Sequence, residues 1–96
     1  MKATVEMLNG ERRRLSLPSP VWEGTSNFGL GTTLTALYIG RRTHRVVMRV
    51  YSIWSNGLEV TGEQFLECDD YQIVTFCKEF PEFAEMWDKL GEPEEL

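Results

Sequence analysis

The sequence predicts an α+β domain in which a four-stranded antiparallel sheet, built from two hairpins, precedes two to three helices packed on one of its faces. Two observations lead to this class. The first half of the chain alternates apolar and polar residues, as half-buried strands do. The last third repeats its apolar residues at helical spacing. Because 96 residues suit a single domain, we expect one compact domain over 1–91 and a frayed acidic tail over 92–96.

The first predicted hairpin joins Lys2–Leu8 to Glu11–Leu17. A two-residue turn would place arginines opposite the apolar face of the first strand, whereas a loop of odd length places leucines there. We therefore expect a three-residue loop with Gly10 at positive φ, because a slip of one residue turns a whole strand over. The expected cross-strand pairs are Ala3–Leu17, Val5–Leu15, Met7–Arg13 and Glu6–Arg14.

The segment Pro18–Gly31 is predicted to be a long loop, since it is rich in proline and glycine. Loops of this length in compact domains are usually functional or disordered, and its apolar aromatics argue against plain disorder. Two interpretations stay open. Trp22 and Phe28 fold back as a lid over the sheet edge, or at least one of them is an exposed anchor for a partner.

The second predicted hairpin consists of Thr32–Ile39, a turn at Gly40–Thr43, and His44–Trp54. Both strands are rich in β-branched and aromatic residues. The face of the returning strand that lacks charge is the better core face, and it carries Val46, Met48, Val50 and Trp54. The opposite face carries Arg45, Val47, Arg49, Tyr51 and Ile53.

Helix signals follow. Thr61–Gln64 has the form of a capping box and predicts a short helix through Cys68, with an edge strand as the alternative. Asp69 and Asp70 can cap a helix over Tyr71–Glu79, and Pro81 suits the first turn of a last helix. The expected buried stripes of these two helices are Ile73, Phe76, Cys77 and Phe80, and then Phe83, Met86, Trp87 and Leu90, with Gly91 ending the second helix.

The charge is divided along the chain. Residues 1–58 carry eight Lys and Arg against three acids, whereas residues 59–96 carry two against twelve, and the total is −5. This division predicts one basic and one acidic surface, an arrangement better suited to binding than to chemistry.

Residues for catalysis are few. His44 is the single histidine, it lies in an arginine-rich turn, and no phosphate-binding glycine loop precedes a helix. Cys68 and Cys77 are too few for a four-ligand zinc site and are expected to be reduced thiols in the cytoplasm. The three acids Glu67, Asp69 and Asp70 lie close together in sequence at a predicted helix start. This cluster is better explained by helix capping than by a metal site. We expect no enzyme activity, cofactor, metal, signal peptide or membrane span.

The leading hypothesis is a binding protein whose acidic surface meets a basic groove on a larger protein or ribonucleoprotein. Its apolar loop residues would anchor the complex. The candidate partner-binding residues are Trp22, Phe28, Glu63, Glu67, Asp69, Asp70, Glu82, Glu85 and Asp88.

Two alternatives stay open. Arginines of the two hairpins could bind nucleic acid by gripping phosphates, or could pair with the chain's own acids. A homo-oligomer could place the basic edge of one copy against the acidic helices of another, and the oligomeric state is not predicted. The candidate basic residues are Arg12, Arg14, Arg41, Arg42, Arg45 and Arg49.

In size and charge the chain is similar to the small acidic proteins of phages and mobile elements, including inhibitors of bacterial defence such as anti-CRISPR proteins. That resemblance implies an inhibitor, and the excess of acids in residues 59–96 separately suggests mimicry of the phosphate backbone of DNA. It covers size and charge alone, so it assigns no role to any single residue.

Overall fold

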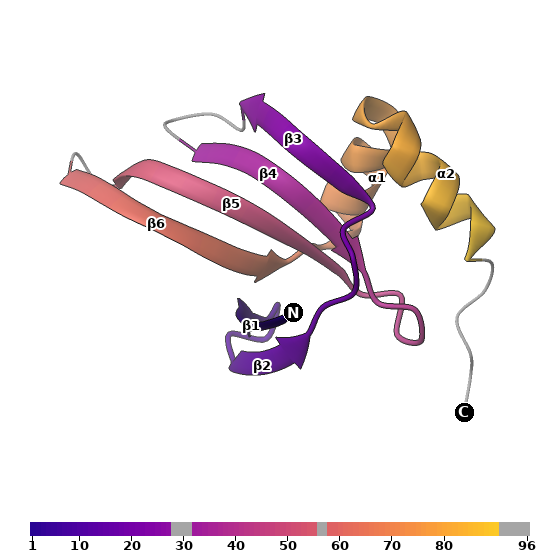
Figure 1. Ribbon diagram of the computed structural model, residues 1–96, viewed down its shortest axis with the longest axis horizontal. Helices are drawn as coiled ribbons and strands as arrows, with labels where there is room; N and C mark the ends of the chain where they lie inside the picture. Colours follow the sequence, from indigo (N-terminus) through magenta and orange to yellow (C-terminus); the bar gives the residue numbers. More distant parts are fainter. Residues whose placement is uncertain (28–31, 56–57, 91–96) are drawn as a thin grey trace.

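The computed structural model describes residues 1–27, 32–55 and 58–90, and it describes side chains for these residues outside 52–61. Figure 1 shows a twisted sheet with two helices packed against it near one end. In chain order the elements are β1 (Lys2–Glu6), β2 (Arg12–Ser16), β3 (Trp22–Asn27), β4 (Thr32–Ile39), β5 (Val46–Ser55), β6 (Leu58–Glu67), α1 (Asp70–Glu79) and α2 (Pro81–Lys89).

The sheet has six strands in the order β2-β1-β6-β5-β4-β3. Neighbouring strands are antiparallel except for β1 and β6, which run parallel. The α+β class is therefore retained, but the predicted four-stranded antiparallel sheet is wrong, because the described chain forms a six-stranded mixed sheet. The two additional strands are β3 and β6.

Strand β6 replaces the short helix that the capping-box pattern at Thr61–Gln64 predicts. Its ten residues pair antiparallel with β5 along most of their length. On its other side it pairs with β1, where Val5 lies opposite Phe65 and Glu6 opposite Leu66. A capping box satisfies two backbone N–H groups, whereas β5 pairs with every residue from Gly62 to Glu67 and β1 adds two pairs at Phe65 and Leu66. The sheet therefore overrides the local signal.

Strand β3 occupies part of the segment predicted to be a loop. It pairs antiparallel with β4, from Trp22 opposite Leu37 to Asn27 opposite Thr33, with an irregularity between Glu23 and Ser26. An edge strand bonds to one neighbour and faces solvent over much of its surface, so it needs no regular apolar alternation. This explains why its polar, glycine-containing sequence resembles a loop.

The first hairpin has the predicted loop but a different register. Leu8, Asn9 and Gly10 lie inside the hydrogen bond that the Met7 N–H donates to the Glu11 carbonyl at 2.8 Å, and Gly10 has φ of 90°. This geometry confirms the positive φ of Gly10. The predicted pairs are wrong by two residues, although a shift of two preserves the faces. The observed pairs are Lys2–Ser16, Ala3–Leu15, Thr4–Arg14, Val5–Arg13 and Glu6–Arg12.

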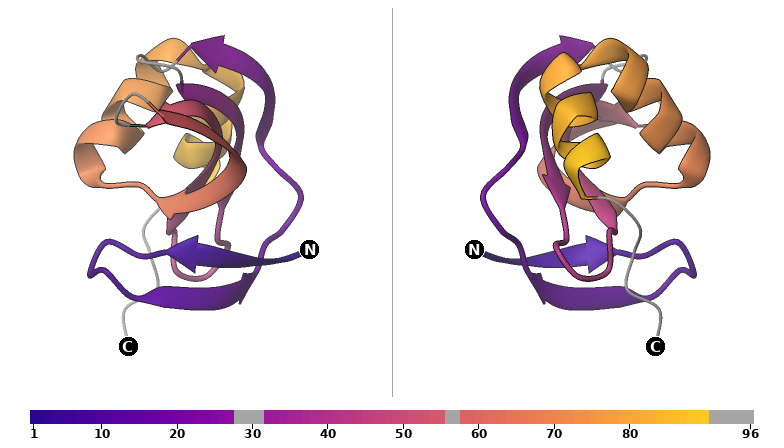
Figure 2. Two further views of the ribbon diagram at one scale, coloured as in Figure 1. Left: turned by 90° about the vertical axis from the view of Figure 1, so that its left-hand side faces the viewer. Right: turned by 90° about the vertical axis from the view of Figure 1, so that its right-hand side faces the viewer.

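The sheet buries apolar residues on both faces. On one face the helices cover a core that includes Val46, Met48 and Val50, as predicted for β5. On the other face the β1–β2 hairpin, which joins the sheet through the pairing of β1 with β6, packs against β4 and β5 (Figure 2), and Val47 and Tyr38 are buried there. Val47 was expected on the uncovered face, and its burial is a consequence of this second core. Trp54 lies outside the residues whose side chains are described.

An irregularity in β4 serves both cores. The register with β5 shifts between Leu34 and Ala36. Leu34 and Leu37, three residues apart, therefore both face the helices, whereas Ala36 and Tyr38 face the hairpin. One strand thus contributes buried side chains to both cores.

Helix α1 begins where the sequence predicts a cap. The Asp69 carboxylate accepts a hydrogen bond from the Gln72 N–H at 2.8 Å, and the Gln72 side chain accepts one from the Asp69 N–H at 3.0 Å. This reciprocal capping box holds the helix start. Helix α2 opens with Pro81, as predicted. Phe76 and Phe83, one from each helix, are almost fully buried, while Gly91 and the tail 92–96 lie outside the described residues.

Candidate functional site

An acidic surface covers the outer side of the two helices. We define the acidic helix surface as the exposed carboxylates Asp69, Asp70, Glu79, Glu82, Glu85 and Asp88. Within the described part of the chain, one of them forms an ion pair, Glu85 with Lys89 at 3.1 Å. Both partners are largely exposed, so this pair neutralises little of the surface. Asp69 accepts the capping hydrogen bond from the Gln72 N–H, and the other four carboxylates, Asp70, Glu79, Glu82 and Asp88, are open to a cationic partner.

Exposed apolar side chains lie on the same helices. Tyr71 is 80% exposed and Val74 is 52% exposed. They are three residues apart on α1, so they are neighbours on its surface, and Val74 lies one turn from Asp70. Met86 on α2 is 41% exposed, although the sequence pattern placed it in the buried stripe. These three residues form apolar contact area next to the carboxylates.

Trp22, a predicted anchor, lies against Phe80, the residue that joins α1 to α2. It is half-buried, and its ring centroid lies 4.3 Å from that of Phe80, at the edge of the helix-side core. A Cβ atom at position 24 would lie 3.0 Å from Cζ2 of Trp22, so Gly24 leaves room for the ring. This position corresponds to the folded-back interpretation. Phe28, the second predicted anchor, lies outside the described residues.

Two predicted acidic residues lie apart from the helices. Glu63 is exposed on β6, opposite Tyr51 of β5. The Glu67 carboxylate faces the hairpin, where it accepts a hydrogen bond from the Leu8 N–H at 2.9 Å and lies 3.5 Å from the Arg45 guanidinium. Glu67 therefore belongs to the contact between β6 and the hairpin rather than to the acidic helix surface.

The arginines of the candidate basic site come from separate elements. Four of them are exposed and form no ion pair with any described carboxylate, and these are Arg12, Arg14, Arg41 and Arg42. Arg45 pairs with Glu67. Arg49 is half-buried and donates a hydrogen bond from Nε to the Thr35 hydroxyl at 2.9 Å.

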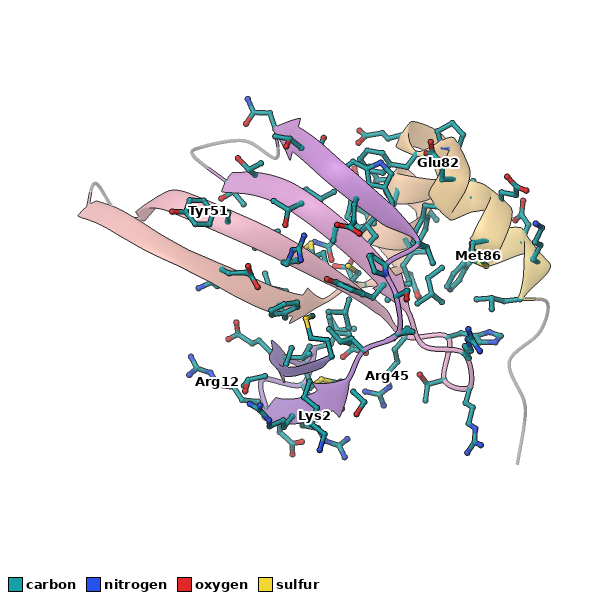
Figure 3. All side chains as sticks on the ribbon, in the orientation of Figure 1. Lys2, Arg12, Arg45, Tyr51, Glu82 and Met86 are labelled. Atoms are coloured by element: carbon teal, nitrogen blue, oxygen red, sulfur yellow. The ribbon has the colours of Figure 1, made fainter. Side chains whose placement is uncertain are left out.

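The two kinds of charge are separated in part. In Figure 3, Lys2, Arg12 and Arg45 lie toward the β1–β2 hairpin, while Glu82 and Met86 lie on the helices. Among the described side chains, Arg45 with Glu67 is the one ion pair that joins a basic residue of the first half to an acid of the second. The division of charge along the chain is therefore only partly kept in space, because Arg41 lines a cavity together with Met86 of α2, and Lys78 and Lys89 lie on the helices themselves.

The described side chains do not assemble an activated nucleophile. Burial, and then the nearby Asp69 and Glu67, raise the pKa of the Cys68 thiol to about 12. Burial, followed by Asp88, raises the pKa of Cys77. Both thiols are therefore protonated near neutral pH, the less reactive form. Over the described residues, no three His, Cys, Asp or Glu side chains lie close enough together to hold a metal ion.

The buried thiol predicts a dependence of stability on pH. Its pKa is higher in the folded state, about 12, than the ordinary value of 9.0, so ionisation favours unfolding as pH rises through this interval. Urea denaturation measures the free energy of unfolding at each pH. Between about pH 8 and about pH 10.5 we expect this free energy to fall less in Cys68→Ala than in the natural chain. Cys77→Ala is the matched control, because Cys77 is less buried. An equal loss in all three proteins would contradict the assignment.

No helix in the described ranges has both the length and the apolar character needed to cross a bilayer.

Comparisons of this chain with protein families, with curated proteins and with solved structures find no match.

Proposed function

We propose that this protein is a non-enzymatic binding protein that occupies a basic surface or groove of a larger protein or ribonucleoprotein. One observation carries the proposal. The acidic helix surface presents six exposed carboxylates, and within the described chain Glu85 is engaged by an ion pair and Asp69 by the capping hydrogen bond, which leaves four open. A groove that ordinarily holds nucleic acid has the complementary charge.

In this proposal the charges affect the rate of association, and the apolar contacts affect the rate of dissociation. Exposed carboxylates on the two helices accelerate encounter with a cationic surface over distances of about 10 Å at 0.1 M salt. Tyr71, Val74 and Met86 then supply area that is removed from water when the complex forms. Because contacts of this second kind mainly slow dissociation, they determine how long the complex lasts.

The proposal places the protein in the cytoplasm. Both cysteines are free thiols, with Cys68 buried and Cys77 half-buried. Paired disulfides are typical of oxidising compartments, whereas free thiols suit a reducing one. A cytoplasmic position would also give access to nucleic-acid-binding enzymes, which are the class of partner proposed.

The test uses the full chain attached to beads and a variant in which four helix carboxylates are neutralised, Asp70→Asn, Glu82→Gln, Glu85→Gln and Asp88→Asn. We expect the natural chain to capture from cell lysate a basic protein that duplex DNA or RNA displaces. For that purified partner, the variant should associate about tenfold or more slowly at low salt. This difference should shrink at high salt, because exposed charges are then screened.

The matched control neutralises four exposed arginines, Arg12, Arg14, Arg41 and Arg42, each by substitution with Gln. We expect this control to capture the same partner as the natural chain. Capture that survives loss of the carboxylates but fails in the arginine control would contradict the proposal. Retention of nucleic acid in place of a protein would overturn it in favour of a nucleic-acid-binding domain.

A further inference from the structure

Arg13 lies on the same face of the first hairpin as its apolar side chains. Arg13 lies opposite Val5 in the register and shares its face with Leu15 and Leu17. The other members of this face are mostly buried, with Val5 at 0% and Leu17 at 8% exposure. Arg13 is itself exposed, so its guanidinium stays open to solvent at the edge of this buried face. It has no ion pair among the described residues, so its charge is not neutralised by a described carboxylate.

A cavity of about 340 Å³ opens beside Arg13, between the hairpin and the β4–β5 turn. Its floor is apolar and is formed by buried side chains of both layers, namely Met7, Leu17, Tyr38 and Val47. Arg13 and Arg45 line it as well, together with the hydroxyl-bearing Ser16 and Thr43. This volume lies near the lower end of the roughly 300–1,000 Å³ range of small-molecule pockets. An apolar floor with a few converging polar groups is the usual composition of such pockets.

The charges around this cavity do not cancel. A neighbouring cavity of about 290 Å³ shares Met7, Arg13 and Arg45 with it and is bordered by Glu67. The Glu67 carboxylate, whose side chain is 10% exposed, is engaged by Arg45 at 3.5 Å and by the Leu8 N–H at 2.9 Å. Burial raises the pKa of the Tyr38 phenol, so the floor stays neutral. Two guanidinium groups against one carboxylate leave a single positive charge.

We propose that this cavity binds a small organic carboxylate, whose apolar body fills the floor and whose carboxylate lies between Arg13 and Arg45. A monocarboxylate supplies the one negative charge that the site lacks, and a guanidinium group can hold it with two parallel hydrogen bonds. A compact anion such as inorganic phosphate would leave the apolar floor unfilled. The site is separate from the acidic helix surface and stands independently of the function proposed above.

The test titrates the full chain with 4-phenylbutyrate, which has an aromatic body and one carboxylate. Binding is measured by calorimetry and by shifts of backbone amide signals. We expect shifts at Met7, Arg13, Gly40 and Thr43, because these residues line the cavity. The neutral 4-phenylbutanol should bind about tenfold more weakly, since a charged hydrogen bond is lost. Inorganic phosphate should not produce these shifts. A short peptide ending in Phe, compared with its amide, distinguishes a protein C-terminus from a free acid as the source.

Matched variants separate this site from general charge attraction. Arg13→Gln should weaken 4-phenylbutyrate binding about tenfold, and Arg13→Lys should restore part of the affinity. Arg14→Gln removes the same charge from the next residue, which points to the opposite side of β2, and should leave binding unchanged. Equal weakening by Arg13→Gln and Arg14→Gln would overturn the proposal. So would equal binding of the acid and the alcohol, or no amide shift in the folded natural chain.

Discussion

Substitution of Phe83 by Ala is expected to lower the free energy of unfolding by about 3–5 kcal/mol. Phe83 is 0% exposed and lies where α1, α2 and the sheet meet. Its ring centroid lies 6.0 Å from that of Phe76 and 6.1 Å from that of Trp87. Removing the ring would leave a cavity that these aromatic neighbours cannot readily fill. Urea denaturation followed by circular dichroism measures the loss, which is a large share of the ~5–15 kcal/mol typical of a domain.

Met86→Ala on the same helix is the control for this prediction. Met86 is 41% exposed, so its truncation should change the unfolding free energy by less than about 1 kcal/mol. If Phe83→Ala and Met86→Ala cost the same, the helices do not pack on the sheet as described.

Substitution of Tyr38 by Ala tests the second core and is also expected to cost about 3–5 kcal/mol. Tyr38 is 2% exposed and contributes to the core between the sheet and the β1–β2 hairpin. Its ring centroid lies 6.1 Å from that of Phe65 on β6. Loss of the ring should also increase amide hydrogen exchange in β1 and β2, because their inner face would lose a large packing partner. Urea denaturation and hydrogen exchange measure the two effects.

Two controls accompany the Tyr38 variant. Tyr38→Phe keeps the ring and should retain most of the stability, which separates packing from the hydroxyl group. Tyr51→Ala removes a tyrosine from the adjacent strand that is 41% exposed and should cost much less. A loss of less than about 1 kcal/mol in Tyr38→Ala would mean that the hairpin does not cover this face.

Local patterns predicted the elements whose residues interact with near neighbours in sequence. The α1 stripe is visible because Ile73, Phe76 and Phe80 recur at the period of the helix and pack on one core. Asp69 and Gln72 satisfy each other's backbone groups within four residues of chain. Gly10 marks its turn because positive φ suits glycine.

The missed strands depend on partners that are distant in sequence. Strand β6 is central in the sheet because β1, from the other end of the chain, pairs with it. The spacing of apolar residues within β6 carries no information about that pairing. A sequence window containing Thr61–Gln64 shows a helix-cap pattern and cannot show its strand neighbours. The edge strand β3 is hidden for the opposite reason, since its few buried side chains leave no alternation to detect.

The sequence predicts which charged residues of the candidate site are exposed, but not how the surrounding surface is shaped. The exposed carboxylates of α1 and α2 follow from their positions off the buried stripes. Tyr71 and Val74 lie off the buried stripe of α1, so their exposure follows from the helical spacing. The apolar anchors were instead predicted in the aromatic loop, at Trp22 and Phe28. The inward position of Arg13 follows from the face alternation of the hairpin, whereas the cavity beside it required the β4–β5 turn.

The parallel pairing of β1 with β6 has a consequence for the order of folding. Val5 meets Phe65 across a separation of 60 residues, so this contact closes most of the chain into a loop. Loop closure of this kind costs conformational entropy before any contact compensates for it, and it slows folding. During synthesis the ribosome releases the N-terminal hairpin long before its partner strand. The backbone edge of β1 therefore stays unpaired, and open to contact with other chains, until β6 has been synthesised.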